Sequence, residues 1–156
     1  MRIYLITVSS RVPAWIDAGF QEYAKRLAPV CPLHLVQIPP TRRTATAGIK
    51  RFRQTEAKRI HAAIPAGAWV VALDEKGQRW SSVELARQLE GWMQRSSDLA
   101  LLIGGADGLD QDCIEQADQL WSLSPLTLPH ALIRVIVAEQ LYRAWSLLNH
   151  HPYHRR

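Results

Sequence analysis

Short apolar segments rich in β-branched residues alternate with longer segments of helical periodicity along this chain. The short segments span residues 2–8, 33–38, 69–73 and 98–103. Strands that are joined by helices run parallel, and a parallel sheet needs helices on both of its faces. With 156 residues the chain has the size of one domain. The alternation therefore predicts a single α/β domain over residues 1–156 with a mainly parallel sheet.

The helical segments are predicted from apolar residues at spacings of three and four. We expect the first helix to begin near Pro13 and to end before Pro29, and we expect Ser81 or Ser82 to cap the third. Residues 74–77 are predicted to turn the chain after a strand. The other expected elements are a helix over residues 49–63, a helix over residues 110–118, an extended segment over residues 120–128 broken at Pro125, and a polar tail over residues 149–156.

A long helix predicted over residues 129–148 is apolar on nearly all of its sides. A surface helix of a monomer normally has a polar face. One side is therefore expected to pack on the sheet and the other to meet a second copy of the chain in a two-fold dimer. The alternative is a helix that lies at the centre of the monomer.

Positive charge is concentrated in one stretch. Residues 41–61 hold seven basic residues and one acidic residue, a charge of +6, which leaves −1 for the rest of a chain whose net charge is +5. Residues 41–47, with Arg42 and Arg43, have no apolar periodicity and are predicted to form a basic loop. A concentrated positive patch favours a polyanion such as RNA, because each neutralised phosphate releases counterions. The alternative is the solvated face of a helix beside a loop.

Several functional classes are disfavoured. Cys31 and Cys113 lie too far apart for a redox pair or a zinc site, and a reducing compartment is expected. The three histidines of residues 150–154 have no acidic or cysteine partner at ligand spacing, so no metal is expected. No segment reaches the roughly 20 apolar residues of a membrane span, and the N-terminal apolar run is too short for a signal peptide. We therefore expect a cytoplasmic protein.

Three segments follow predicted strands, where ligands of parallel sheets bind. They are Leu73 with Asp74, Gly104 with Gly105, and residues 123–128. Glycine allows a ligand to approach the backbone closely, although the spacing here matches no standard nucleotide motif and a plain tight turn is the alternative. Residues 123–128 are apolar and interrupted by proline, so their backbone groups cannot all join a sheet. They favour a nucleoside site, with a kinked crossover as the alternative.

Blocks of residues spread over the chain resemble the ribosomal RNA large subunit methyltransferase H family. The blocks are residues 101–105, 121–124, 126–130, 134–135, 139–144 and 152–155. The resemblance covers essentially the full chain. The sequence departs from the family's pattern at two places. The glycine loop has Ala106 and Asp107 between its glycines, and the chain ends with Arg155 and Arg156.

The resemblance implies an enzyme of the SPOUT class with a C-terminal trefoil knot. It implies methylation, by S-adenosylmethionine, of N3 of a pseudouridine in 23S ribosomal RNA of the assembled ribosome, at a composite site built by a homodimer. Neither a metal nor a covalent nucleophile is needed, because the sulfonium carries an activated methyl group. Carried over by residue, the methyl-donor site comprises Leu73, Gly104, Leu123, Ser124, Pro125, Leu126, Thr127 and Leu128.

We further hypothesise an RNA-facing catalytic site to which both protomers contribute. Its residues are Glu139, Arg143, Tyr153, His154 and Arg155. Arginines would hold phosphate or the developing anion, while a histidine or carboxylate could help N3 lose its proton; the sequence leaves the identity of a base open. The alternative function is a non-catalytic ribosome-binding or assembly factor with the same fold.

Overall fold

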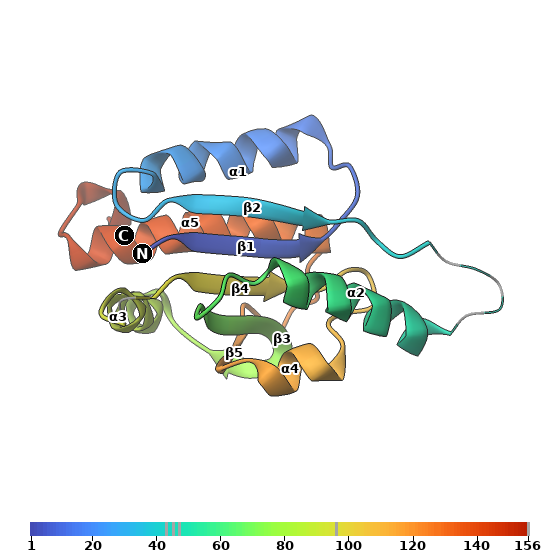
Figure 1. Ribbon diagram of the computed structural model, residues 1–156. Helices are drawn as coiled ribbons and strands as arrows, with labels where there is room; N and C mark the ends of the chain where they lie inside the picture. The colour runs from blue at the N-terminus through green and yellow to red at the C-terminus, as the bar shows by residue number, and fades with distance from the viewer. Residues whose placement is uncertain (43, 45, 47, 96, 156) are drawn as a thin grey trace.

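The computed structural model describes residues 1–42, 44, 46, 48–95 and 97–155. Its centre is one sheet with strand order β2-β1-β4-β3-β5 (Figure 1). All neighbouring strands pair in parallel, as the alternation predicts. The strands are β1 (Ile3–Val8), β2 (Leu33–Ile38), β3 (Trp69–Arg79), β4 (Leu99–Ile103) and β5 (Gln119–Ser122).

Helices cover both faces of the sheet (Figure 1). The helices α1 (Ala14–Leu27), α3 (Ser82–Met93) and α5 (His130–Leu148) share a core cluster with one face. The other face packs against α2 (Ile49–Ala63) and α4 (Gln111–Gln116). A short 3-10 turn, η1 (Pro152–His154), lies against α5 near the C-terminus.

The central strands β1 and β4 are apolar at almost every position because both of their faces are buried. In β1, Ile3 and Leu5 point to the side of α1 and α5, whereas Ile6 and Val8 point to the side of α2. Full burial of such a side chain stabilises the fold by about 1.5–3 kcal/mol. The alternation of faces along β1 and β4 therefore holds the two helical layers to one sheet.

The third strand differs from its prediction. Residues 74–77 belong to β3 and form a bulge, instead of a turn that ends the strand. Pairing with β5 shifts between Leu73 and Gln78, which both align with Trp121. Lys76 donates its backbone N–H to Asp74 Oδ1 at 2.9 Å, so a turn does occur, but within the strand. Hydrogen-bonded pairing of β3 with β5 resumes after the bulge because β5 extends past it. The sequence around residue 74 gives no indication of this pairing.

Two helix boundaries are set by side-chain caps. The hydroxyl of Ser81 accepts from the backbone N–H of Glu84, whose carboxylate accepts from the N–H of Ser81, so Ser81 and not Ser82 is the cap of α3. Asp110 caps α4, which ends at Gln116, two residues before the predicted end. The predicted extended segment after α4 is a strand only to Ser122, and the residues beyond it form a loop.

Helix α5 packs between α1 and α3 and is therefore central to its layer. This position agrees with the alternative prediction, in which the apolar helix lies at the centre of the monomer. One stripe of α5 nevertheless faces away from the sheet. Leu132, Ile136, Glu139 and Arg143 recur at helical spacing along it and are half-exposed. No helix in the described part of the chain is long and apolar enough to cross a membrane.

Candidate active site

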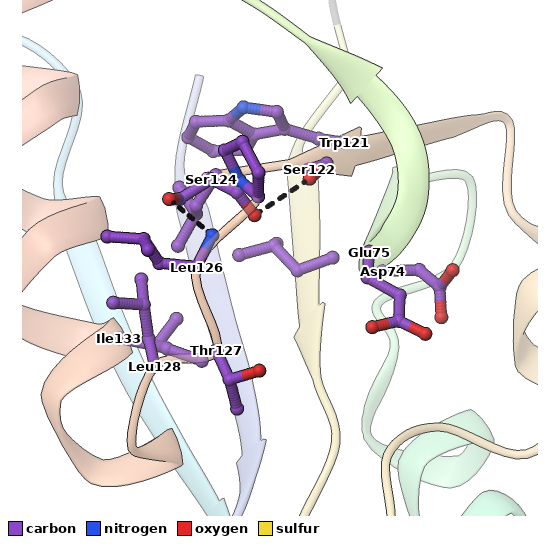
Figure 2. Close-up of a pocket in the computed structure, with 12 residues that line it drawn as sticks. Asp74, Glu75, Trp121, Ser122, Ser124, Leu126, Thr127, Leu128 and Ile133 are labelled. Carbon is purple, nitrogen blue, oxygen red and sulfur yellow. Dashed lines mark hydrogen bonds between the residues drawn. The ribbon is translucent and has the colours of Figure 1, made fainter.

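A pocket of about 190 Å³ opens between the bulge of β3 and the carboxyl end of β5, and is called here the strand-end pocket (Figure 2). It is the place at which a parallel sheet normally binds its ligand. Leu73 and all six residues of 123–128 line it, so seven of the eight predicted donor-site residues are brought together. The other lining residues are Asp74, Glu75, Trp121, Ser122 and Ile133.

The loop of residues 123–128 is shaped by its own Ser124 and by Ser122 at the end of β5. The hydroxyl of Ser122 donates to the carbonyl of Ser124 at 3.4 Å, and the hydroxyl of Ser124 accepts the backbone N–H of Leu126 at 2.9 Å (Figure 2). No hydrogen bond from the described residues engages the backbone N–H of Thr127 or Leu128. These donors line an apolar pocket and are available to a flat ligand with polar edges.

The pocket has an acidic side, of which sequence reasoning named Asp74 in a candidate segment but missed Glu75. Asp74 and Glu75 come from the bulge of β3 and lie across the pocket from Thr127 (Figure 2). Both residues follow the segment predicted as a strand, which could have indicated them as site residues. The turn predicted at residues 74–77, however, would have placed Glu75 outside the pocket. Ile133 also lines the pocket, from the first turn of α5, and no local pattern marks it.

Gly104 lies at the end of β4 but is not among the residues that line the strand-end pocket. A Cβ at Gly104 would lie 2.4 Å from the backbone carbon of Gly108 and 2.5 Å from the nitrogen of Leu109. Its own loop therefore requires glycine here. The predicted contact of Gly104 with a donor nucleoside stays a prediction.

We expect Gly104→Ala to lower the free energy of unfolding by about 1–3 kcal/mol, because backbone atoms must move to admit the methyl group. Chemical denaturation measures this change. The matched control is Gly91→Ala in α3, where a Cβ meets nothing within 4 Å and alanine stabilises a helix by up to about 1 kcal/mol. Equal effects of the two substitutions would contradict the crowding at Gly104.

Three of the five predicted catalytic residues meet at the outer face of α5, and are called here the tail cluster: Glu139, Arg143 and Tyr153. Oε1 of Glu139 accepts from Arg143 Nη2 at 2.5 Å, from Arg143 Nε at 3.0 Å and from the Tyr153 hydroxyl at 2.9 Å. Oε2 accepts from Gln140 at 2.7 Å. The carboxylate is thus occupied on both oxygens, which argues against Glu139 as a general base.

The two donors of the tail cluster keep their protons. Burial, and then hydrogen bonds with Tyr23 and Glu139, raise the pKa of Tyr153. The hydrogen bond to Glu139 raises the pKa of the Arg143 guanidinium. At neutral pH the cluster therefore presents a phenol and a cation, which can bind or stabilise an anion but cannot remove a proton.

His154 and Arg155 follow Tyr153 without joining its hydrogen bonds. His154 is half-buried, and its Nδ1 has no hydrogen-bond partner among the described residues, while Arg155 is exposed after η1. Arg156 lies outside the described residues. The tail is therefore docked through Tyr153 and not frayed.

The strand-end pocket and the tail cluster are separated within one chain. Ile133 lines the pocket and Arg143 belongs to the cluster, and their separation of ten positions corresponds to about 15 Å along a helix. The pocket lies beside the first turns of α5, whereas η1 packs near its end. The structure thus brings together two groups of predicted residues, but does not join them in one protomer.

The basic loop borders a second, larger cavity of about 300 Å³. Its lining comprises Thr41, Arg42, Thr44, Thr46, Arg51, Phe52 and Thr55. Hydroxyls and guanidinium groups of this kind suit phosphate. Arg43, the second arginine of the predicted loop, lies outside the described residues.

The described residues contain no cluster of three His, Cys, Asp or Glu side chains that could hold a metal ion. Cys31 and Cys113 are free and buried, and burial raises the pKa of each thiol to about 11. Both thiols therefore stay protonated at neutral pH and are poor nucleophiles.

Comparison with known proteins gives consistent matches. Residues 1–154 match a family described as "Predicted SPOUT methyltransferase". The chain is 56% identical to the ribosomal RNA large subunit methyltransferase H of Nitrosococcus oceani and 55% identical to that of Thioalkalivibrio sulfidiphilus, in each case over 99% of both chains. The same enzyme of Hydrogenovibrio crunogenus is 48% identical over 99% of both chains.

Solved structures support the same fold. A probable methylase family protein from Haemophilus influenzae Rd KW20 superposes with a TM-score of 0.56 at 14% identity, over 99% of this chain and 70% of the other. A putative methylase family protein from Neisseria gonorrhoeae superposes with a TM-score of 0.54 at 15% identity, over 96% of this chain and 93% of the other.

Proposed function

The chain belongs to the ribosomal RNA large subunit methyltransferase H family of SPOUT methyltransferases, and from this premise we propose that it methylates large-subunit ribosomal RNA with S-adenosylmethionine. The target, as the sequence resemblance implies, is N3 of a pseudouridine in 23S RNA of the assembled ribosome. The observation that carries the proposal is the strand-end pocket, whose loop is the segment predicted from sequence to hold the donor.

The pocket fits the chemistry of the donor. Leu123, Leu126 and Leu128 provide apolar surface for an adenine ring, and the backbone N–H groups of Thr127 and Leu128, which no described residue engages, suit its polar edge. The carboxylates of Asp74 and Glu75 give the opposite side a negative charge, which suits a cationic donor. When bound, S-adenosylmethionine supplies an activated methyl group.

The tail cluster supplies the electrostatic part of the reaction. Transfer to N3 requires loss of the N3 proton, and a fixed cation beside N3 favours its deprotonated form. We assign this role to Arg143, which Glu139 holds by two hydrogen bonds. Tyr153 donates its hydroxyl proton to Glu139 and helps to hold that carboxylate, and Arg155 and His154 contact RNA. Glu139 is a positioning residue in this scheme.

A two-fold dimer would combine the two separated groups. If the outer stripes of two α5 helices pack antiparallel, the pocket near the start of one helix approaches the cluster near the end of the other. The apolar members of the stripe, Leu132 and Ile136, favour such packing. Each complete site would then take its donor pocket from one protomer and its tail from the partner.

We expect the protein to be a dimer at micromolar concentration, because the half-exposed apolar residues of the stripe, Leu132 and Ile136, can be buried against a second copy. Light scattering measures the mass in solution, and Ile136→Glu is expected to shift it toward that of one chain. Val83→Glu, at an exposed residue of α3, is the matched control and should leave the dimer intact. A wild-type protein of single-chain mass would contradict the composite site.

The function is tested by mapping modified nucleotides in 23S RNA by mass spectrometry. A strain that lacks the protein should lose one methyl group, and the purified protein with S-adenosylmethionine should restore it on ribosomes. A non-catalytic assembly factor would restore nothing and need show no saturable binding in a donor titration. A cytoplasmic location, where ribosomes are found, and a C-terminal trefoil knot remain part of the proposal.

A further inference from the structure

Helix α1 holds a tyrosine against the tail cluster. The hydroxyls of Tyr23 and Tyr153 lie 3.4 Å apart, and their rings meet edge to face with centroids at 6.3 Å. Tyr142 of α5 completes the group, with its ring centroid 4.7 Å from that of Tyr153 and 6.4 Å from that of Tyr23. Tyr153 is thus enclosed between α5 and α1, of which α1 lies far from the tail in sequence.

The protons of these hydroxyls define a direction. A phenol hydroxyl has one proton to donate. Tyr153 donates it to the carboxylate of Glu139, because this contact, at 2.9 Å, is the shorter of the two and its acceptor is charged. Tyr23 is then the donor in the 3.4 Å pair, and the oxygen of Tyr153 accepts. A hydrogen-bonded series therefore runs from Tyr23 through Tyr153 to Glu139, and Glu139 fixes Arg143.

A second residue of α1 supports the same group. The guanidinium carbon of Arg26 lies 5.6 Å from the ring centroid of Tyr23, 5.6 Å from that of Tyr142 and 5.7 Å from that of Tyr153. Glu22 holds this guanidinium at 2.5 Å. A guanidinium over aromatic faces is attracted by their electron density, so Arg26 helps to hold the three rings together. A 3-10 turn of three residues near a chain end needs this external support.

We propose that Tyr23 is a positioning residue of the methyl-transfer site, which acts by orienting Tyr153 and, through Glu139, the guanidinium of Arg143. The proposal rests on the function proposed above. It assigns a role in the reaction to α1, a helix that contributes nothing to the lining of the strand-end pocket. Loss of the Tyr23 hydroxyl should therefore affect the reacting geometry and spare the donor.

The test compares Tyr23→Phe with Tyr4→Phe. Phenylalanine keeps the ring and removes only the hydroxyl, and Tyr4 on β1 is a matched control because no hydrogen bond from its hydroxyl occurs among the described residues. We expect Tyr23→Phe to lower kcat on ribosomes about tenfold, the upper range for one net hydrogen bond. Affinity for S-adenosylmethionine and the thermal midpoint should stay unchanged, and Tyr4→Phe should match the wild type in all three measurements.

A double-mutant cycle distinguishes positioning from general loss of structure. If Tyr23 acts through Tyr153, adding Tyr23→Phe to Tyr153→Phe lowers kcat no further. Independent, multiplying effects would overturn the proposal, as would a Tyr23→Phe variant with normal kcat while Tyr153→Phe is slow. A wild-type protein that transfers no methyl group to ribosomal RNA would instead overturn the proposed function, and the positioning role with it.

Discussion

Deleting residues 153–156 is expected to lower methyl transfer to ribosomes by at least about a hundredfold, because alignment of the reacting atoms is the main catalytic device of this site. Affinity for S-adenosylmethionine should stay within about twofold of the wild type, since the deleted residues lie outside the strand-end pocket. Single-turnover kinetics and equilibrium titration measure the two quantities. Circular dichroism checks that the shortened chain is folded.

A matched control for the deletion is Arg42→Ala in the basic loop. Arg42 lies beside threonine hydroxyls in the second cavity and is expected to contact phosphate. Its loss should weaken ribosome binding and flatten the salt dependence, yet leave turnover at saturating ribosome nearly normal. A tail deletion that abolishes donor binding, or that leaves methylation intact, would show that the tail does not act on RNA.

Mixing two inactive variants is expected to restore activity to about a quarter of the wild-type level, if each site combines residues of both protomers. One variant is the tail deletion. The other is Ser124→Trp, which fills the strand-end pocket and removes the hydroxyl that holds Leu126. Random pairing makes half of the dimers mixed. In each mixed dimer the intact pocket of one protomer meets the intact tail of the partner, so one of two sites works.

Co-expression with two different affinity tags isolates the mixed dimers, whose activity should be about half of the wild-type level because one of the two sites works. Each parental variant alone should transfer no methyl group above background. Ser124→Trp should bind no donor, whereas the tail deletion should bind it normally. If donor pocket and tail act within the same chain, mixed dimers stay inactive because no chain has both. That result would refute the composite site but would leave the methyltransferase function standing.

Local patterns predicted most of the elements and the donor loop. Strands β1 and β4 are recognisable as continuous apolar runs, since burial on both faces leaves no polar position. Residues 123–128 were marked by an apolar composition broken by Pro125, and they line the pocket. In both cases the physical cause acts within a few residues of the chain.

The other site residues depend on which strands and helices become neighbours. Glu75 lines the pocket only because β5 continues past the bulge of β3. Tyr23 fits the apolar stripe of α1, and nothing near it in sequence indicates a hydroxyl partner 130 residues away. Glu139 and Arg143 are four residues apart on one helix, a spacing at which an ion pair is local, but only the docked tail adds Tyr153 to it. Periodicity reports which face of an element is buried, whereas the tertiary structure decides what that face meets.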